Sequence, residues 1–242
     1  MAPGVSRETL DELTARYGLP DGAEGQLARL LETLAVEPDP HTTASDPEAA
    51  LETHVADSLS GLEVPEVRKA RRLADIGAGP GFPGLVLAVA NPQAQVDLIE
   101  SAGRKAAVAD RLLQAAQVTN ARTVKARAEE WGAVAPALGG GAGAYDVVTA
   151  RAVGPLAVLV EYAAPLLLVG GVLVAWKGAR DAEEEAVAAA AAERLRMAVR
   201  GVERVVPFEG AVNRHLHVFE KTGPTPEGFP RRPGMARKRP LG

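Results

Sequence analysis

One stretch decides the fold of this chain: Asp75-Ile-Gly-Ala-Gly-Pro-Gly-Phe-Pro-Gly84. It lies between two short apolar segments, residues 73–76 and 85–90, which read as a strand and a helix. Closely spaced glycines at such a junction let the backbone approach a ligand without hindrance from Cβ atoms. The next expected strand ends in Glu100, and an acid about 20 residues beyond a Gly-rich turn is placed to bind a ribose hydroxyl pair. The sequence therefore predicts a site for a nucleoside-containing cofactor.

The composition excludes several classes of function. The chain has 242 residues, of which 47% are hydrophobic and 24% charged, and it has no cysteine. This excludes disulfides, thiolate metal sites and cysteine nucleophiles. The N-terminus has no apolar signal segment, and the longest apolar run, residues 163–175, is interrupted by Pro165 and Gly170. We therefore expect a cytoplasmic protein that contacts no membrane and holds no metal.

The charge is unevenly distributed. The net charge of −4 indicates that the chain as a whole is not a nucleic-acid binder. Residues 225–242, however, carry five basic side chains and one acid, so this tail has a charge of +4 and the remainder −8. A basic tail on an acidic body is a common means of binding a polyanion. The basic residues are Arg231, Arg232, Arg237, Lys238 and Arg239.

Strands and helices alternate after residue 70. We expect strands at 72–76, 95–100, 121–125, 145–150, 171–176, 202–208 and 215–221, and helices near 83–90, 103–118, 155–168 and 181–199. Alternation of this kind predicts a mostly parallel sheet with helices on both faces and the ligand at its carboxyl edge. Residues 209–214 are too few for a parallel crossover, so the last strand should be antiparallel. Six strands with a seventh reversed is the strand count of the Rossmann-like α/β sheet of class I S-adenosylmethionine-dependent methyltransferases, which we therefore expect here.

Helices are also expected before the sheet. Residues 6–36 carry leucines at helical spacing, and a break at 37–47 precedes a helix with His54, Asp57 and Ser58 on one face. These three side chains either line the substrate entrance or pin the helix against the sheet. We expect three parts: an N-terminal helical segment (1–60), a cofactor-binding domain (61–224) and a basic C-terminal tail (225–242).

The Gly-rich turn matches the patterns of two cofactors. Residues 79–84 have the G-x-G-x-x-G spacing of nicotinamide enzymes, whereas residues 75–81 have the acid and three glycines of S-adenosylmethionine enzymes. Pro80 and Pro83 remove two N–H donors that a pyrophosphate requires. An acid suits the cationic methionyl amine and sulfonium better than two phosphates, and Phe82 can close over the ligand. These features favour S-adenosylmethionine.

Later strand ends add candidates. Ala128 and Glu129 follow the third expected strand, where adenine contacts usually lie, although an acid there is also favoured by the helix dipole. Arg151 follows the fourth strand and would lie over the cofactor or form a structural ion pair. Lys177 ends the fifth strand, where it could face a substrate.

Several motifs together resemble a family, the bacterial small-subunit ribosomal RNA guanine-N7 methyltransferases called RsmG or GidB. The similarity runs from about residue 51 to 240. Besides the Gly-rich stretch, the matching segments are His54-Val-Ala-Asp-Ser58, Leu98-Ile-Glu-Ser101, Arg127-Ala-Glu-Glu130, Val148-Thr-Ala-Arg-Ala-Val153, Lys177-Gly178 and Arg231-Arg-Pro-Gly234.

The resemblance implies transfer of a methyl group from S-adenosylmethionine to N7 of a guanine in 16S rRNA near the decoding site. It implies cofactor contacts at Gly77, Phe82, Ala128, Glu129 and Arg151, with Glu100 on the ribose. With the neighbouring turn and strand-end residues, the expected cofactor site comprises Asp75, Gly77, Gly79, Gly81, Phe82, Glu100, Ser101, Ala102, Ala128, Glu129 and Arg151.

No catalytic residue is expected, because guanine N7 has a free lone pair and no proton, so its attack needs no general base. We expect the protein to act as a monomer on 16S rRNA or the small ribosomal subunit. The expected RNA contacts are His54, Asp57, Ser58, Lys177, Arg231, Arg232, Arg237, Lys238 and Arg239, with Arg104 and Lys105 as further phosphate contacts. Two other functions stay open: an NAD(P)-dependent oxidoreductase and a non-catalytic RNA-binding module.

Overall fold

The fold is organised around a seven-stranded sheet with the strand order β3-β2-β1-β4-β5-β7-β6. The computed structural model describes residues 6–42 and 44–242. The strands are β1 (Arg72–Ile76), β2 (Gln95–Ile99), β3 (Ala121–Val124), β4 (Tyr145–Arg151), β5 (Leu167–Lys177), β6 (Met197–Arg204) and β7 (His215–Lys221). The first five are parallel, and β7 is antiparallel to β5 and β6. The expected mostly parallel sheet with an antiparallel last strand is confirmed.

Two strands differ from the expected ranges. The strand expected at 202–208 is β6, which starts at Met197 and ends at Arg204, before Pro207. The strand expected at 171–176 begins earlier, at Leu167, because the glycine pair does not interrupt it. At Gly171 a Cβ atom would lie 2.8 Å from the carbonyl oxygen of Asp146. The glycine therefore allows close approach of two strands where the sequence suggested a break.

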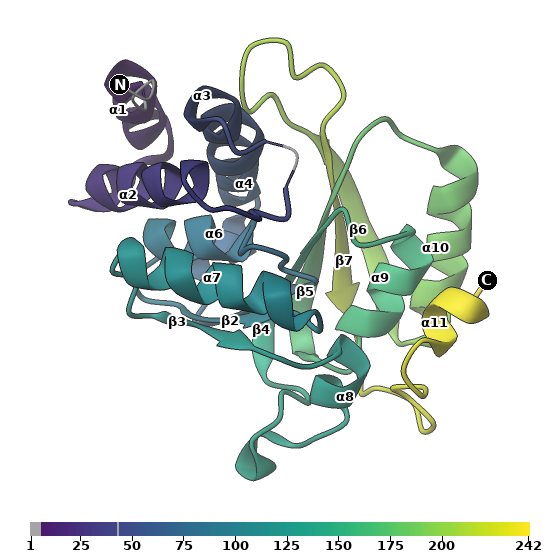
Figure 1. Ribbon diagram of the computed structural model, residues 1–242. Coiled ribbons are helices and arrows are strands. Elements are labelled where there is room, and N and C mark those ends of the chain that lie inside the picture. The colour runs from purple at the N-terminus through teal and green to yellow at the C-terminus, as the bar shows by residue number, and fades with distance from the viewer. Residues whose placement is uncertain (1–5, 43) are drawn as a thin grey trace.

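Helices cover both faces of the sheet (Figure 1). One face is covered by α6 (Gly84–Ala90) and α7 (Gly103–Ala115), and the other by α9 (Leu156–Ala163) and α10 (Ala182–Arg194). The short helix α8 (Ala128–Gly132) follows β3, and a single turn, η3 (Pro136–Leu138), precedes β4. Helices α9 and α10 end earlier than expected, since β5 and β6 begin within the ranges assigned to them.

The N-terminal segment is a series of short helices. They are α1 (Arg7–Tyr17), α2 (Ala23–Ala35), α3 (Pro47–Ala50), η1 (Leu51–Ala56), α4 (Asp57–Leu59), η2 (Ser60–Glu63) and α5 (Pro65–Lys69). The helical region expected at 6–36 is divided because Gly18, with φ of 61°, ends α1 in the left-handed conformation. The segment η1 is a π-helical turn, a form that often occurs at functional sites.

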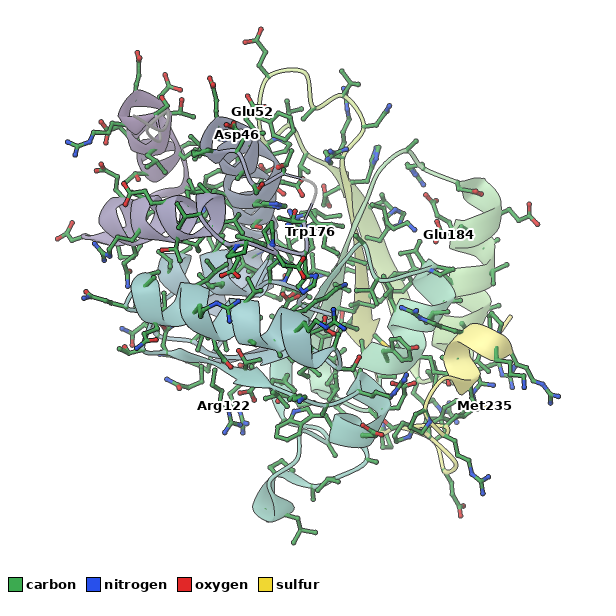
Figure 2. All side chains as sticks on the ribbon, viewed as in Figure 1. Asp46, Glu52, Arg122, Trp176, Glu184 and Met235 are labelled. Atoms are coloured by element: carbon green, nitrogen blue, oxygen red, sulfur yellow. The ribbon has the colours of Figure 1, made fainter. Side chains whose placement is uncertain are left out.

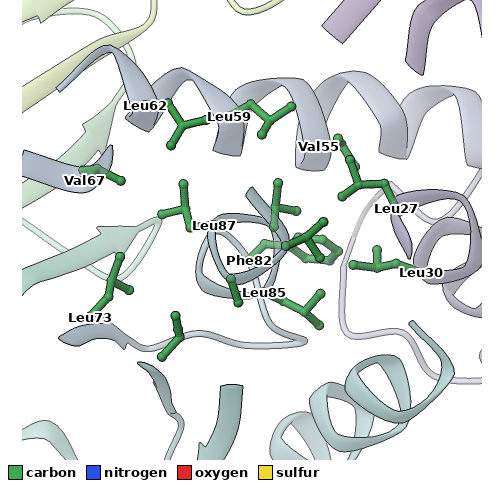
Figure 3. Packing of buried hydrophobic residues seen from close by; sticks show 14 of the residues in the cluster. Leu27, Leu30, Val55, Leu59, Leu62, Val67, Leu73, Phe82, Leu85 and Leu87 are labelled. Carbon is green, nitrogen blue, oxygen red and sulfur yellow. The ribbon is translucent and has the colours of Figure 1, made fainter. Parts of the chain in front are cut away.

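These N-terminal helices share a core with the sheet. Figure 3 shows Leu27, Leu30 and Val55 packed on the same side as Phe82 and Leu85 of the Gly-rich turn and α6. The core therefore crosses the boundary expected at residue 60. The division of the chain at 60 and 224 stays a prediction.

The C-terminal residues are also packed against the body. Helix α11 (Met235–Lys238) lies beside α9 (Figure 1), and Ala236 and Leu241 are buried in the core of that face. Within the described residues, we find no helix with the length and apolar character needed to span a membrane.

Candidate functional site

The Gly-rich turn satisfies its own backbone. Every N–H group from Gly77 to Leu85 donates to an acceptor within the protein, and the two prolines have none. Gly77 and Ala78, for example, donate to the carbonyl of Ile99 at 2.8 and 3.2 Å. A pyrophosphate needs free N–H donors at such a turn, so the turn does not suit a dinucleotide.

Asp75 lies beneath this turn and is not among the residues that line the two cavities described below. Its side chain is fully buried, and its two oxygens accept hydrogen bonds at 2.8 Å from Gly84 N and from the hydroxyl of Thr149. Gly84 allows this contact, since a Cβ there would lie 2.6 Å from Cβ of Asp75. Asp75 was expected among the cofactor contacts; the structure makes it the residue that fixes the turn to β1 and β4.

Burial raises the pKa of Asp75 from 3.8 to about 7, although Gly84 N–H and Thr149 oppose the shift. Folding therefore favours the protonated carboxyl. The contribution of Asp75 to the stability of the fold is complete below pH 4 and is lost as the pH rises through 7. Asn at this position reproduces the neutral hydrogen bonds without titrating. We expect the free energy of unfolding of the native protein to fall relative to that of Asp75→Asn by about 4 kcal/mol between pH 4 and 8.

Urea denaturation of both proteins at several pH values measures this difference. Substitution of the exposed acid Asp110 by asparagine serves as the control. The free energies of unfolding of this variant and the native protein should differ by the same amount at every pH. Parallel curves for Asp75→Asn and the native protein would contradict the prediction.

A cavity of about 300 Å³ opens at the carboxyl ends of β1, β2 and β3. This is within the range of roughly 300–1,000 Å³ for small-molecule sites. Six of the expected cofactor residues line it: Gly77, Glu100, Ser101, Ala102, Ala128 and Glu129. The other lining residues are Ile76, Ile99, Lys105, Ala126, Arg127, Ala152, Val153, Tyr162 and Arg237.

Glu100 is held in place at the floor of this cavity. Its carboxylate accepts from Gly79 N at 3.0 Å through Oε2 and from Ala102 N at 2.7 Å through Oε1. The residue is 7% exposed, and each oxygen keeps a further lone pair. Gly77 forms the adjacent wall, where a Cβ would lie 2.6 Å from Cγ2 of Val153. The glycine is therefore required for the close approach of these two segments.

A second cavity of about 590 Å³ lies next to the first. It is lined by Thr42, Thr53, His54, Asp57, Arg151, Ala152, Gly154, Trp176, Lys177, Gly178 and Arg214. Ala152 lines both cavities and has φ of 57°, a left-handed conformation that is strained for a residue with a side chain. Strain of this kind concentrates at functional sites, and here it marks the junction of the two cavities.

Arg151 joins β4 to the π-helical turn across the second cavity. Its Nη1 donates to Asp57 at 2.7 Å and to the carbonyl of Thr53 at 2.9 Å, and its Nη2 lies 3.2 Å from Nδ1 of His54. Asp57 is buried, and its backbone carbonyl accepts from the indole of Trp176 at 2.9 Å. Figure 2 shows Trp176 near the middle of the molecule, below the N-terminal helices.

His54 is neutral in this arrangement. Burial lowers its pKa to about 4, and the positive charge of Arg151 adds to the effect. Nδ1 faces a donor on Arg151, so the proton is on Nε2, which lies 2.7 Å from the hydroxyl of Thr42. The imidazole ring stacks on Phe82 with centroids 4.4 Å apart. His54 is thus an oriented, uncharged group.

Several expected residues are not brought to the first cavity. Gly79 and Gly81 shape the turn, and Phe82 is buried against His54 in the core. Arg151 lines the second cavity. Ser58, an expected RNA contact, is fully buried, and its hydroxyl donates to the carbonyl of His54 one helical turn earlier.

Two arginines of the basic tail contact other parts of the protein. Arg231 pairs with Glu161, Nε to Oε1 at 2.6 Å, and Arg237 donates to the carbonyl of Val153 at 2.8 Å. Both arginines were expected to bind RNA phosphates. Arg232, Arg237, Lys238 and Arg239 are exposed, whereas Arg231 is partly exposed. Lys177 lines the second cavity, where its ammonium pairs with Glu184 at 2.7 Å.

Sequence reasoning missed part of both cavities. Tyr162 lies within an apolar helix, and its sequence gave no signal for a site. Arg214 directly precedes β7 and reaches the second cavity because His215 pairs with Lys177, at the carboxyl end of the antiparallel neighbour β5. The signal that was available, a basic residue preceding a strand at the sheet's carboxyl edge, is weak.

Sequence comparisons show what the chain is similar to. A family model described as "rRNA small subunit methyltransferase G" matches residues 28–216. A relative named "Ribosomal RNA small subunit methyltransferase G" from Chloroflexus aggregans is 37% identical over 98% of this chain and 99% of its own length. A relative of the same name from Roseiflexus castenholzii is 40% identical over 83% of both chains.

The fold is similar to that of a solved structure titled a predicted O-methyltransferase, protein Atu636 from Agrobacterium tumefaciens. It has a TM-score of 0.52 and 22% sequence identity, and the match covers 70% of this chain and 80% of that one. The similarity concerns the fold, which is that of the class I methyltransferases.

Proposed function

The chain belongs to the rRNA small subunit methyltransferase G family, and we propose that it transfers a methyl group from S-adenosylmethionine to N7 of a guanine in 16S rRNA near the decoding site. The observation that carries the proposal is the pair of cavities that meet at Ala152. One has the features of a nucleoside site, and the other is lined by aromatic, basic and acidic side chains. A donor and an acceptor bound side by side would meet at this junction.

The residues of the first cavity fit S-adenosylmethionine, which supplies an electrophilic methyl group on a sulfonium. Glu100 is fixed by two backbone N–H groups and keeps lone pairs for the ribose hydroxyls. Ser101 and Ala102 continue this wall, and Ala128 and Glu129 lie where the adenine is expected. The N–H groups of the Gly-rich turn are used internally, which suits a ligand without phosphates.

The second cavity would hold the guanine. Its N7 atom carries a lone pair and no proton, so none of the lining residues has to act as a general base. Neutral His54, the Arg151–Asp57 pair and Lys177 would orient the base. Orientation of two reactants can lower the activation free energy by roughly 7–11 kcal/mol. The proposed catalytic contribution of this chain is therefore alignment.

The RNA must present its guanine outside an intact helix, because side chains cannot reach N7 in the narrow major groove of A-form RNA. We propose phosphate contacts for basic residues that are exposed or partly exposed, and their contribution to affinity should fall with rising salt. They are Arg104, Lys105, Arg214, Arg232, Lys238 and Arg239. We further propose that the protein works as a monomer in the cytoplasm on 16S rRNA or the small subunit.

Transfer of labelled methyl from S-adenosylmethionine to small-subunit RNA tests the proposal. We expect label in N7-methylguanosine at one site, and mapping of that nucleoside in rRNA from cells with and without the gene locates it. Label in no rRNA nucleoside, or thermal stabilisation by NADH but not by S-adenosylmethionine, would refute the function.

A further inference from the structure

We propose that the C-terminal segment, residues 231–241, is a wall of the S-adenosylmethionine cavity and that Arg237 binds the adenosine part of the cofactor. The inference rests on the proposed function and deepens it. It assigns Arg237 to the cofactor and leaves the exposed Arg232, Lys238 and Arg239 of the same segment for RNA phosphates.

Arg237 reaches the cavity from outside the strand ends that form its floor. Its Nη2 donates to the carbonyl of Val153 at 2.8 Å, and its side chain lines the cavity together with Tyr162. Val153 is the residue that lies against Gly77. Arg237 is therefore fixed relative to the Gly-rich turn through a single intervening residue.

The segment that carries Arg237 is anchored at several points. Arg231 pairs with Glu161, which is only 2% exposed, and also donates to the carbonyl of Arg239 at 2.8 Å. Gly234 N donates to Oε1 of Glu129 at 2.8 Å. Since Glu129 lines the cavity, the segment contacts the expected adenine end directly. A chain held in this way cannot move freely to follow an RNA backbone.

The chemistry of Arg237 favours the adenosine part. A guanidinium has five N–H donors and a flat face that stacks on aromatic rings. One donor is used by Val153, so others remain for the acceptor nitrogens of a purine, while the flat face suits its ring. The methionine end carries a carboxylate as well as an ammonium and a sulfonium, so the assignment to adenosine rests on position: the segment of Arg237 contacts Glu129, where the adenine is expected. Figure 1 shows α11 beside α9, the helix that carries Tyr162.

Isothermal titration of S-adenosylmethionine and of S-adenosylhomocysteine into two variants tests the proposal. Arg237→Met keeps most of the side-chain volume and removes the donors. Arg194→Met changes an exposed arginine at the end of α10 and is the matched control. We expect Arg237→Met to raise the Kd of both ligands at least tenfold, since both contain adenosine, and Arg194→Met to leave it within twofold. Affinity for small-subunit rRNA should change equally in the two variants.

Circular dichroism of each variant without ligand shows whether it is folded. Arg237→Lys is a milder second variant, which keeps the positive charge but loses the planar group, and we expect its Kd to lie between those of the native protein and Arg237→Met. If Arg237→Met binds both ligands as tightly as Arg194→Met, or loses only RNA affinity, the inference is wrong. Methyl transfer by the native protein would then still support the proposed function. If the native protein binds neither ligand, the proposed function itself fails, and this inference with it.

Discussion

Substitution of Glu100 by alanine is expected to weaken binding of S-adenosylmethionine by about 10²- to 10⁴-fold, because two charge-assisted hydrogen bonds of roughly 1.5–3 kcal/mol each are lost. The loss extends beyond the ribose. Gly79 N and Ala102 N both donate to this carboxylate, so its removal also releases the turn that forms the cavity wall.

Glutamine should be nearly as harmful as alanine at this position. Each carboxylate oxygen of Glu100 receives a backbone N–H, one from Gly79 and one from Ala102. An amide has only one acceptor oxygen, so its NH₂ group must face one of these donors. A near-isosteric substitution therefore places two donors against each other in a site that is 7% exposed.

Calorimetric titration of the cofactor into Glu100→Ala, Glu100→Gln and the native protein measures the effect. Asp110→Ala, an exposed acid on α7 that does not line the cavity, is the control and should bind normally. A Kd for Glu100→Gln within threefold of the native value would show that the carboxylate does not bind the ribose.

The sequence predicted those features that depend on local pattern. Strand ends and the Gly-rich turn are read from residues close together in the chain, so the sheet, Glu100 and Gly77 could be located without a structure. Asp75 was recognised for its motif, yet its role was not. An acid at a strand end can face a ligand or a backbone N–H, depending on how the following turn is folded. Here the turn brings Gly84 N to the carboxylate of Asp75.

The internal contacts of Arg231 and Arg237 were not foreseen, for a different reason. Composition shows that residues 225–242 are basic, but it does not show which acids they meet. Glu161 lies 70 residues before Arg231 in the chain, within a helix of otherwise apolar residues. A buried acid needs a partner, and this indicates in retrospect that one tail arginine would be used internally. Pairing over such distances is determined by packing, which no local pattern records.

Substitution of Arg151 by methionine is expected to destabilise the fold by roughly 3–5 kcal/mol, because it removes the hydrogen-bonded partner of the buried Asp57 carboxylate. Among the described residues, Oδ1 of Asp57 has no hydrogen bond, and its remaining cationic neighbour is Nε of Arg214 at 3.3 Å. The carbonyl of Thr53 also loses its donor. Methyl transfer should fall by about 10²-fold even where the variant is folded, since the groups that orient the guanine are displaced.

A double-mutant cycle separates the charge from the rest of the effect. In the background of Asp57→Asn, Arg151 no longer has a buried carboxylate as its partner. Arg151→Met should therefore lower the free energy of unfolding much less in that background than in the native protein. Urea denaturation gives the four free energies of unfolding. The His54 resonances give a second readout: without the neighbouring positive charge, the pKa of His54 should rise from about 4, although burial still holds it below its ordinary value.

Arg214→Met is the matched control for this cycle. Arg214 also faces Asp57, but its side chain is 38% exposed against 14% for Arg151, so water replaces most of what it provides and the loss should be no more than about 1 kcal/mol. If the two arginines cost the same, or if the effects of Arg151→Met and Asp57→Asn simply add, then the ion pair does not hold the π-helical turn against β4. The second cavity would then be shaped by packing around Trp176 alone, and alignment of the guanine would have to depend on the RNA rather than on this pair.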